Sequence, residues 1–196
     1  TPFDGGMKVP CIVSWPAGGV GANANSTVTV TETDGTSRTS PTLRVTSSSM
    51  NFDIFTTLLS LCGITDGDGT PYLPGDRVID GADLSSLWRG EVSPDHSVHD
   101  MLFYQKKGKV QAVQMIKVPV HTDSGTEYYD FKYFDRVQTE NSAFIDQYYV
   151  NYLFNLDLDP IEGYNVSMVY PEVAAKLNSA LEEFRSEMKS NRRGIL

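Results

Sequence analysis

The sequence predicts a strand-and-helix part over residues 1–95, followed by a smaller α+β part over residues 96–196. Three observations carry this prediction. The short apolar run at 10–15 is typical of a strand buried on both faces within a parallel sheet. Aromatic and β-branched runs separated by turns fill residues 101–157 and favour an antiparallel sheet. Residues 171–189 have helical periodicity and predict one helix that covers this sheet.

The first 45 residues predict a loop, a buried strand and an exposed hairpin. The run TPFDGGMKVPCIVSWP contains a Gly-Gly pair and one base, and then the apolar segment Cys11–Val13, which Trp15-Pro16 closes. Residues 27–45 alternate Thr with Val and break at Asp34-Gly35. This pattern predicts a solvent-facing hairpin with a two-residue turn.

A helix is predicted over residues 50–64. Ser49 can cap its start, Asp53 lies in its first turn and Gly63 can end it. Its apolar residues recur at helical spacing: Met50, Ile54, Leu58 and Leu61.

The second part is predicted to hold four strands and a final helix. The strands are expected at 102–104, 110–120, 128–133 and 152–156. Pro171 starts the helix, whose apolar face is expected to comprise Val173, Leu177, Leu181, Phe184 and Met188. We place the boundary between the two parts near residues 91–99.

Charge and composition exclude several function classes. The formal net charge of -9 and the lack of a basic run argue against binding to nucleic acid or to an anionic membrane surface. No apolar stretch approaches membrane-spanning length, and no leader is recognisable, so localisation cannot be read from the sequence. Cys11 and Cys62 match no zinc spacing, and we expect two small buried side chains in preference to a disulfide.

Two stretches far apart in the chain resemble sulfatase motifs. Residues 1–16 resemble the family's Gly-Gly stretch that leads into a buried strand, and YLFNLDLDPIEGYNV at 152–166 resembles its late signature. The resemblance implies an alkaline-phosphatase-like α/β fold and the hydrolysis of sulfuric esters of the arylsulfatase type. This chain would then hold the tail of the large α/β domain, with the hairpin near 27–45 as an insertion, and a small C-terminal α+β subdomain. The run Asp80–Leu84 also resembles a family motif that precedes a short helix, which would end here at Trp88.

The resemblance also implies a cofactor set. Sulfatases use a formylglycine, made from the Cys or Ser of a C/S-x-P/A-x-R motif, beside Ca²⁺ or Mg²⁺ that Asp and Asn side chains hold. Neither Cys11 nor Cys62 begins such a motif, and the nearest run, Thr39–Arg44, has Thr in the nucleophile position and its Arg one place too late. We therefore expect no catalytic residue and no metal ligand in this chain, and no activity without the upstream part of the same sulfatase.

Lys8 and His121 are the candidate substrate-binding residues. Lys8 stands where the family usually has an arginine after Gly-Gly, and the alternative interpretation is a structural ion pair. AVQMIKVPVH at 112–121 resembles the strand that brings a histidine to the pocket mouth in arylsulfatase-A-like enzymes, although Gln114 and Pro119 replace basic residues. We expect His121 at the end of this strand, on the side of Gly5-Gly6. The alternative is an exposed histidine at a strand end.

Three functions remain open from the sequence. The leading one is sulfuric ester hydrolysis, acting on a sulfated small molecule or a sulfated sugar. The others are a phosphate or phosphonate ester hydrolase of the same superfamily and a non-catalytic accessory or binding module. For a sulfatase we expect a periplasmic, secreted or lysosomal location. The pair His96 and His99 has metal-ligand spacing but no third ligand nearby in the sequence, so we assign no metal to it.

Overall fold

The computed structural model describes residues 3–106, 108–139 and 147–190, with the side chains of residues 136–150 left out. The chain forms two compact units, of which one comprises residues 1–10 and 100–196 and the other residues 11–99. The first ten residues therefore group with the C-terminal half of the chain. The predicted domain division at residue 95 remains a prediction.

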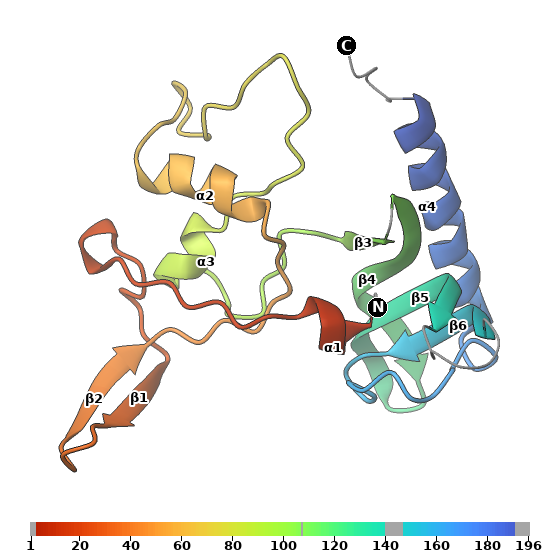
Figure 1. Ribbon diagram of the computed structural model, residues 1–196, viewed down its shortest axis with the longest axis horizontal. Helices are drawn as coiled ribbons and strands as arrows, with labels where there is room; N and C mark the ends of the chain where they lie inside the picture. Colours follow the sequence, from red (N-terminus) through yellow and green to blue (C-terminus); the bar gives the residue numbers. More distant parts are fainter. Residues whose placement is uncertain (1–2, 107, 140–146, 191–196) are drawn as a thin grey trace. The chain divides into compact units, whose positions relative to one another are not determined.

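A four-stranded antiparallel sheet and one helix build the first unit (Figure 1). The strands follow the sheet in chain order: β3 (Met101–Lys106), β4 (Lys109–Thr122), β5 (Gly125–Thr139) and β6 (Gln147–Asn155). The helix α4 (Pro171–Ser190) packs on one face of the sheet, and the short helix α1 (Asp4–Met7) lies on the other side (Figure 1). The predicted antiparallel sheet with one covering helix is confirmed.

The core of this unit lies between α4 and the sheet. Val173, Leu177 and Leu181 of α4 are buried there, as their spacing predicts. The sheet contributes buried apolar side chains from three strands: Val110, Val113, Met115, Val118, Phe131, Tyr133 and Leu153. Phe184 extends the contact because its ring stacks on Phe103, with centroids 3.9 Å apart and planes inclined by 8°.

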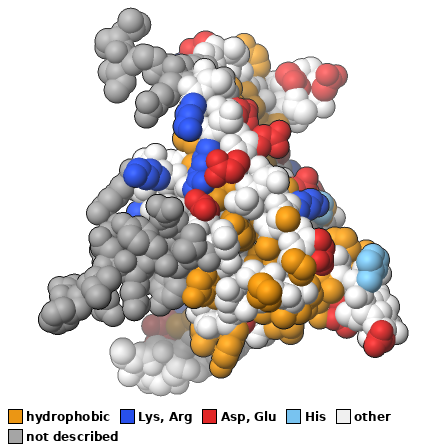
Figure 2. Space-filling model, turned by 90° about the vertical axis from the view of Figure 1, so that its right-hand side faces the viewer, with side chains coloured by type: hydrophobic (Ala, Val, Ile, Leu, Met, Phe, Trp, Pro, Cys, Tyr) orange, Lys and Arg blue, Asp and Glu red, His pale blue; other side chains and the backbone are white. Residues whose placement is uncertain are grey.

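The loop between β6 and α4 instead exposes apolar side chains: Leu158, Ile161, Tyr164, Met168 and Val169. Hydrophobic side chains gather on the surface in Figure 2, which views this unit from the α4 side.

A β-bulge interrupts β4. The register with β5 shifts between Met115 and Val118, and Lys117 has a positive φ of 53°. Pro119 lies just beyond this bulge, where β4 pairs with β5 but no longer with β3. A proline is tolerated there because its missing N–H would face an unpaired edge. The expected bulge or edge near Pro119 is confirmed.

The second unit holds a hairpin and two helices. The hairpin pairs β1 (Ser26–Thr31) with β2 (Ser37–Thr42), and both strands are exposed, as predicted. Its turn is longer than the predicted two residues, because Glu32 donates its backbone N–H to the Thr36 carbonyl and leaves three residues, Thr33 to Gly35, between them. Gly35 takes a positive φ of 85°, which closes the turn. The helices are α2 (Asp53–Leu61) and α3 (Ser85–Arg89), and Pro16–Gly18 forms one 3-10 turn.

The predicted helix at α2 exists, but much of its apolar face is exposed. Its buried residues are Asp53, Thr56, Thr57 and Leu61, whereas Phe55 and Leu58 are 47% and 46% exposed. Ser49 does not cap it: the Asp53 carboxylate accepts the backbone N–H of Met50 instead. Gly63 ends it with a positive φ of 69°, as predicted. Polar contacts within the unit therefore decide which face of α2 turns inward.

The predicted buried strand at residues 10–15 is wrong for this structure. These residues form no strand, and Ile12 is 94% exposed. A strand buried on both faces needs paired neighbours, and no described strand pairs with this segment.

Cys11 and Cys62 are free thiols, as expected, but both are exposed where burial was predicted. Among the described residues, no helix combines the length and the apolar character needed to cross a membrane.

Candidate functional site

The Gly5-Gly6 stretch forms the single turn α1, which Asp4 begins. The Asp4 carbonyl accepts the backbone N–H of Lys8 at 2.8 Å, and its carboxylate Oδ2 lies 2.5 Å from Lys8 Nζ. The Lys8 side chain remains 61% exposed. Lys8 therefore makes the ion pair that the alternative interpretation expects, and its amine also reaches solvent.

Asp4 is buried in an ionic cluster with Lys132 of β5 and Glu162 of the loop after β6. Lys132 Nζ lies 2.7 Å from Asp4 Oδ1 and 3.1 Å from Glu162 Oε1. The backbone N–H of Asp4 donates to Glu162 Oε2 at 2.6 Å. These contacts join three segments that are far apart in the sequence, and the Lys132 side chain is 0% exposed.

Burial and charge shape the cluster's ionisation. Burial opposes the ionisation of Asp4, but hydrogen bonds and charge from Lys132 and Lys8 outweigh it and hold the pKa of Asp4 below its ordinary value. Burial dominates at Glu162 and raises its pKa above the ordinary value of 4.5, although Lys132 opposes this shift. The nearby Tyr104 also has a raised pKa, because it is buried and lies close to both carboxylates.

A second polar chain runs beside this cluster on the same face of the sheet, opposite α4. We call this face the α1 face; by strand alternation it carries Gln114, Asp130 and Lys132. Tyr104 donates its hydroxyl to Gln114 Oε1 at 2.6 Å, and Gln114 Nε2 donates to Asp130 Oδ2 at 3.2 Å. Burial raises the pKa of Asp130. Gln114, where the sulfatase-like motif has an arginine, therefore acts as a buried neutral bridge.

His121 lies near the end of β4, as predicted, and is exposed. It pairs in register with Thr126, and its Nδ1 lies 3.0 Å from Thr126 Oγ1. Since Thr126 has the parity of Asp130 and Lys132 along β5, His121 lies on the α1 face. Six residues of strand separate Thr126 from Lys132, which is roughly 20 Å at ~3.3 Å per residue. Lys8, through its partner Asp4, and His121 thus lie on the same face of the sheet. His121 nevertheless lies far from the ionic cluster.

His99 has a partner within the second unit. Its Nε2 lies 2.9 and 3.0 Å from the two carboxylate oxygens of Asp53, which is fully buried. In the part of the chain that the structure describes, no group of three or more His, Cys, Asp or Glu side chains could hold a metal ion. The His99 ring therefore serves a structural hydrogen bond.

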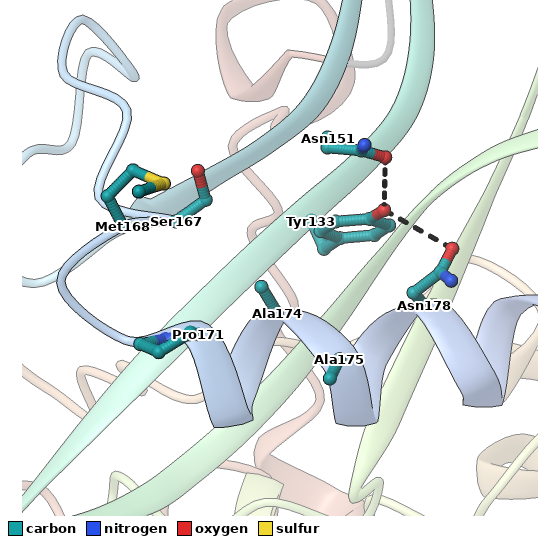
Figure 3. A pocket seen from close by; sticks show the side chains of 8 residues that line it. All are labelled: Tyr133, Asn151, Ser167, Met168, Pro171, Ala174, Ala175 and Asn178. Atoms are coloured by element: carbon teal, nitrogen blue, oxygen red, sulfur yellow. Dashed lines mark hydrogen bonds between the residues drawn. The ribbon is translucent and has the colours of Figure 1, made fainter.

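An open groove of about 290 Å³ lies between α4 and β6 (Figure 3). Figure 3 shows the Tyr133 hydroxyl between the side-chain amides of Asn151 and Asn178, at 2.8 and 3.2 Å from their oxygens. The rest of its lining is Ser167, Met168, Pro171, Ala174 and Ala175. None of these side chains carries a charge, so the groove lacks the cationic groups that would neutralise a sulfate.

Comparison with known proteins identifies relatives by sequence. The chain is 33% identical to the steryl-sulfatase of Mus musculus over 112 residues, and 33% identical to that of Rattus norvegicus over 111 residues. Each match covers 57% of the chain. Over these residues the chain resembles sulfatases. No protein-family model matches it.

The chain spans a small part of its relatives' length, since the matches cover 13% and 14% of the two steryl-sulfatases. Two solved structures also resemble it, each at 20% sequence identity. One comes from work on glycosaminoglycan metabolism by Bacteroides thetaiotaomicron, with a TM-score of 0.44 over 68% of this chain and 24% of that one. The other is BT4656 with its substrate D-glucosamine-2-N,6-O-disulfate, with a TM-score of 0.40 over 80% of this chain and 29% of that one.

The residues of this chain do not fit the cofactors that its resemblance to sulfatases implies. Its sequence contains no C/S-x-P/A-x-R motif that could supply formylglycine. Within the described ranges, no set of carboxylates is grouped as ligands for a divalent cation, and the buried Asp4 and Glu162 pair with Lys132 instead. We therefore assign no chemical step through calcium or formylglycine to this chain.

Sequence reasoning missed the ionic cluster. Asp4 and Glu162 both lie inside the stretches that resemble sulfatase motifs, yet neither was singled out. The available signal was the strand segment Tyr128–Arg136, in which Asp130 and Lys132 alternate with aromatic residues. A lone lysine inside an aromatic strand indicates a buried partner of opposite charge.

Proposed function

We propose that this chain is one part of a longer sulfatase that hydrolyses sulfuric esters, and that it is inactive by itself. The observation that carries the proposal is the 33% identity to steryl-sulfatases over more than half of the chain. The proposed fold is alkaline-phosphatase-like, with the segment 1–95 in the large α/β domain and 96–196 as the small subdomain. The substrate would be a sulfated small molecule or a sulfated sugar.

The structure supports this proposal through the position of the two motif-like stretches. Residues 1–16 and 152–166 meet at the hydrogen bond between Asp4 and Glu162, although 158 positions separate these two residues. Their meeting in a buried cluster gives both stretches a common structural purpose. The Gly5-Gly6 turn is thereby attached to the small sheet.

Lys8 and His121 are the proposed substrate-binding residues, and their separation means that each would meet a different part of the substrate. Each can donate hydrogen bonds to an anionic oxygen, and Lys8 adds positive charge. Lys8 pairs with Asp4 on the α1 face of the sheet, which His121 shares. In this proposal Lys8 also orients the Gly5-Gly6 turn, and His121 borders the mouth of the pocket.

The nucleophile and the divalent cation would come from other parts of the longer polypeptide. Exposed apolar side chains at Ile12, Phe55 and Leu58 support this, because large apolar groups in contact with water are typical of surfaces that another segment covers. A periplasmic, secreted or lysosomal location follows from the proposed family role, and it too is a proposal.

Hydrolysis assays on two proteins test the proposed function. The 196-residue chain and the longer protein that contains it would be compared on an aryl sulfate and on the matching aryl phosphate, with and without Ca²⁺. We expect the longer protein to cleave the sulfate in a Ca²⁺-dependent reaction, and the chain alone to cleave neither ester. Metal-dependent turnover by the chain alone would contradict the proposal.

The same assay separates the alternatives. Preference for the phosphate ester would favour a phosphate or phosphonate ester hydrolase of the same superfamily. Failure of the longer protein on both esters, with a folded state confirmed by thermal unfolding, would favour a non-catalytic accessory module.

A further inference from the structure

The cluster of Asp4, Lys132 and Glu162 closes a ring across the α1 face. Lys132 pairs with both carboxylates, and Glu162 also accepts the backbone N–H of Asp4. The Glu162 carboxylate therefore contacts both other members, and Asp4 contacts Lys132 through its carboxylate and Glu162 through its backbone N–H. This arrangement fixes the position of the Asp4 backbone as well as its side chain.

Aromatic rings cover this cluster. Lys132 Nζ lies 4.3 Å from the centre of the Tyr104 ring and 5.4 Å from that of Phe134. Phe3 packs on Phe134 with ring centroids 4.8 Å apart. A charged group in such surroundings loses its hydration, and a well-packed apolar set of the same volume is often equally stable or more so. Stability alone therefore gives a weak reason for placing these charges here.

Positioning of the N-terminal turn gives a stronger reason. The helix α1 has only four residues and two of them are glycines, so it has little stability of its own. Its hydrogen bond from the Lys8 N–H and its ion pair with Lys8 Nζ both end on Asp4. We infer that Lys132 is a positioning residue that holds Asp4, and through it the Gly5–Lys8 turn, against the four-stranded sheet. Glu162 completes this arrangement by accepting the Asp4 N–H, and we call the three residues the clasp.

Charge and donor geometry agree with this role. Two carboxylates face two amines, those of Lys132 and Lys8, so the four groups balance in charge. The ammonium group of Lys132 donates to Asp4 Oδ1, lies 3.1 Å from Glu162 Oε1 and stands over the Tyr104 ring. The planar fork of an arginine could not reproduce these three directions in the same volume. Lys132→Arg is therefore expected to be a poor replacement.

Hydrogen exchange on the 196-residue chain tests the clasp without any assay of activity. The reporters are the amides of Gly6 and Lys8, which donate to the Phe3 and Asp4 carbonyls. In Lys132→Met we expect their exchange to accelerate by at least about tenfold, since two buried carboxylates lose their counter-ion and the turn opens locally. Trypsin should also cleave after Lys8 faster, whereas cleavage after the exposed Arg38 of the hairpin should not change.

A neutral triple variant distinguishes the loss of positioning from misfolding of the whole unit. Asp4→Asn, Lys132→Met and Glu162→Gln together remove all three charges and leave no unpaired buried ion, so the sheet is expected to remain folded. Faster exchange at Gly6 and Lys8, with unchanged exchange at the sheet amides of Val113 and Phe131, would support positioning. Unchanged exchange at Gly6 and Lys8, or equal acceleration throughout the sheet, would overturn it.

The consequence for turnover rests on the proposed function. In the longer sulfatase, the neutral triple variant is expected to lower kcat by about tenfold or more with little change in KM or Tm, because small displacements near reacting groups are costly. An unchanged kcat, with exchange at Gly6 and Lys8 accelerated, would limit the clasp to a local structural role. Absence of sulfatase activity in the unmodified longer protein would contradict the proposed function and leave the exchange test of the clasp intact.

Discussion

His99 donates from Nε2 to both carboxylate oxygens of the fully buried Asp53, at 2.9 and 3.0 Å. The same carboxylate accepts the backbone N–H groups of Met50 and Ala82 at 2.7 and 2.9 Å. Asp53 thus joins the start of α2, the loop before α3 and the end of the second unit. A buried polar group that loses its partners lowers the free energy of unfolding. We therefore expect Asp53 and its three partners, which we call the Asp53 hub, to govern the stability of residues 11–99.

We expect Asp53→Ala to lower the free energy of unfolding of this unit by about 3 kcal/mol or more, and His99→Ala by about 1–3 kcal/mol. Denaturation followed by tryptophan fluorescence measures the effect, because Trp15 and Trp88 are the chain's two tryptophans and both belong to this unit. His96→Ala, at an exposed histidine, is the matched control. Equal effects of His96→Ala and His99→Ala would contradict the hub.

The stacked pair Phe103 and Phe184 predicts a localised loss of stability in the first unit. Phe184→Ala removes the ring from its partner and should cost about 1–3 kcal/mol, less than a fully buried phenylalanine because Phe184 is only partly buried. Faster hydrogen exchange in the C-terminal half of α4 is the measurement. Glu183→Ala, at the exposed neighbouring position, should leave exchange unchanged.

Glu162 predicts a rise in stability on mild acidification. Its folded-state pKa lies above the ordinary value of 4.5 because of burial, so the folded chain binds this proton more readily than the unfolded chain. Stability should therefore increase as the pH falls from neutral toward about 5. Asp4 acts in the opposite direction: its lowered pKa contributes stability that is lost as the pH falls below its ordinary value of 3.8.

Chemical denaturation across this pH range checks the sign. Glu162→Gln should remove part of the rise between neutral pH and about 5, and Asp130→Asn should remove a further part, since burial also raises the pKa of Asp130. A wild-type stability that falls steadily from pH 7 to 5, with no change in slope in Glu162→Gln, would contradict the assignment.

The exposed apolar face of α2 predicts poor solubility of the chain by itself. Phe55→Glu together with Leu58→Glu should reduce aggregation and the binding of a hydrophobic dye, with little loss of stability, because both side chains are nearly half exposed. Leu61→Ala, at a buried position of the same helix, should instead destabilise the unit by about 2 kcal/mol or more. Loss of folding in the double variant would show that this face packs within the chain.

His121 predicts a change in activity without a change in stability. In the longer sulfatase, His121→Ala should lower kcat/KM by about tenfold, in the range of a lost hydrogen bond to a charged group, while Tm stays unchanged because the side chain is exposed. Thr126→Val, which removes the hydroxyl beside Nδ1, should have a smaller effect. Full activity of His121→Ala would contradict the substrate-binding role and favour the alternative interpretation, an exposed histidine at a strand end.

The sequence by itself determined the local elements. Period-2 and period-3.6 patterns located β3 to β6, the hairpin, α2 and α4, because residues 101–106 and 171–190 carry their folding information in near neighbours. Turn chemistry at Gly63 and Pro119 was also readable, since positive φ and a missing N–H are properties of single residues.

Tertiary structure alone decided which surfaces are buried and which charges meet. Apolar periodicity marks a face of α2 but cannot say whether anything covers it, and the covered face is the one that holds Asp53. Asp4, Lys132 and Glu162 lie on three separate segments, so their pairing depends on the sheet register and on the path of two loops. Electrostatic contacts between distant segments leave no periodic trace in the sequence, and only the fold brings them within hydrogen-bond distance.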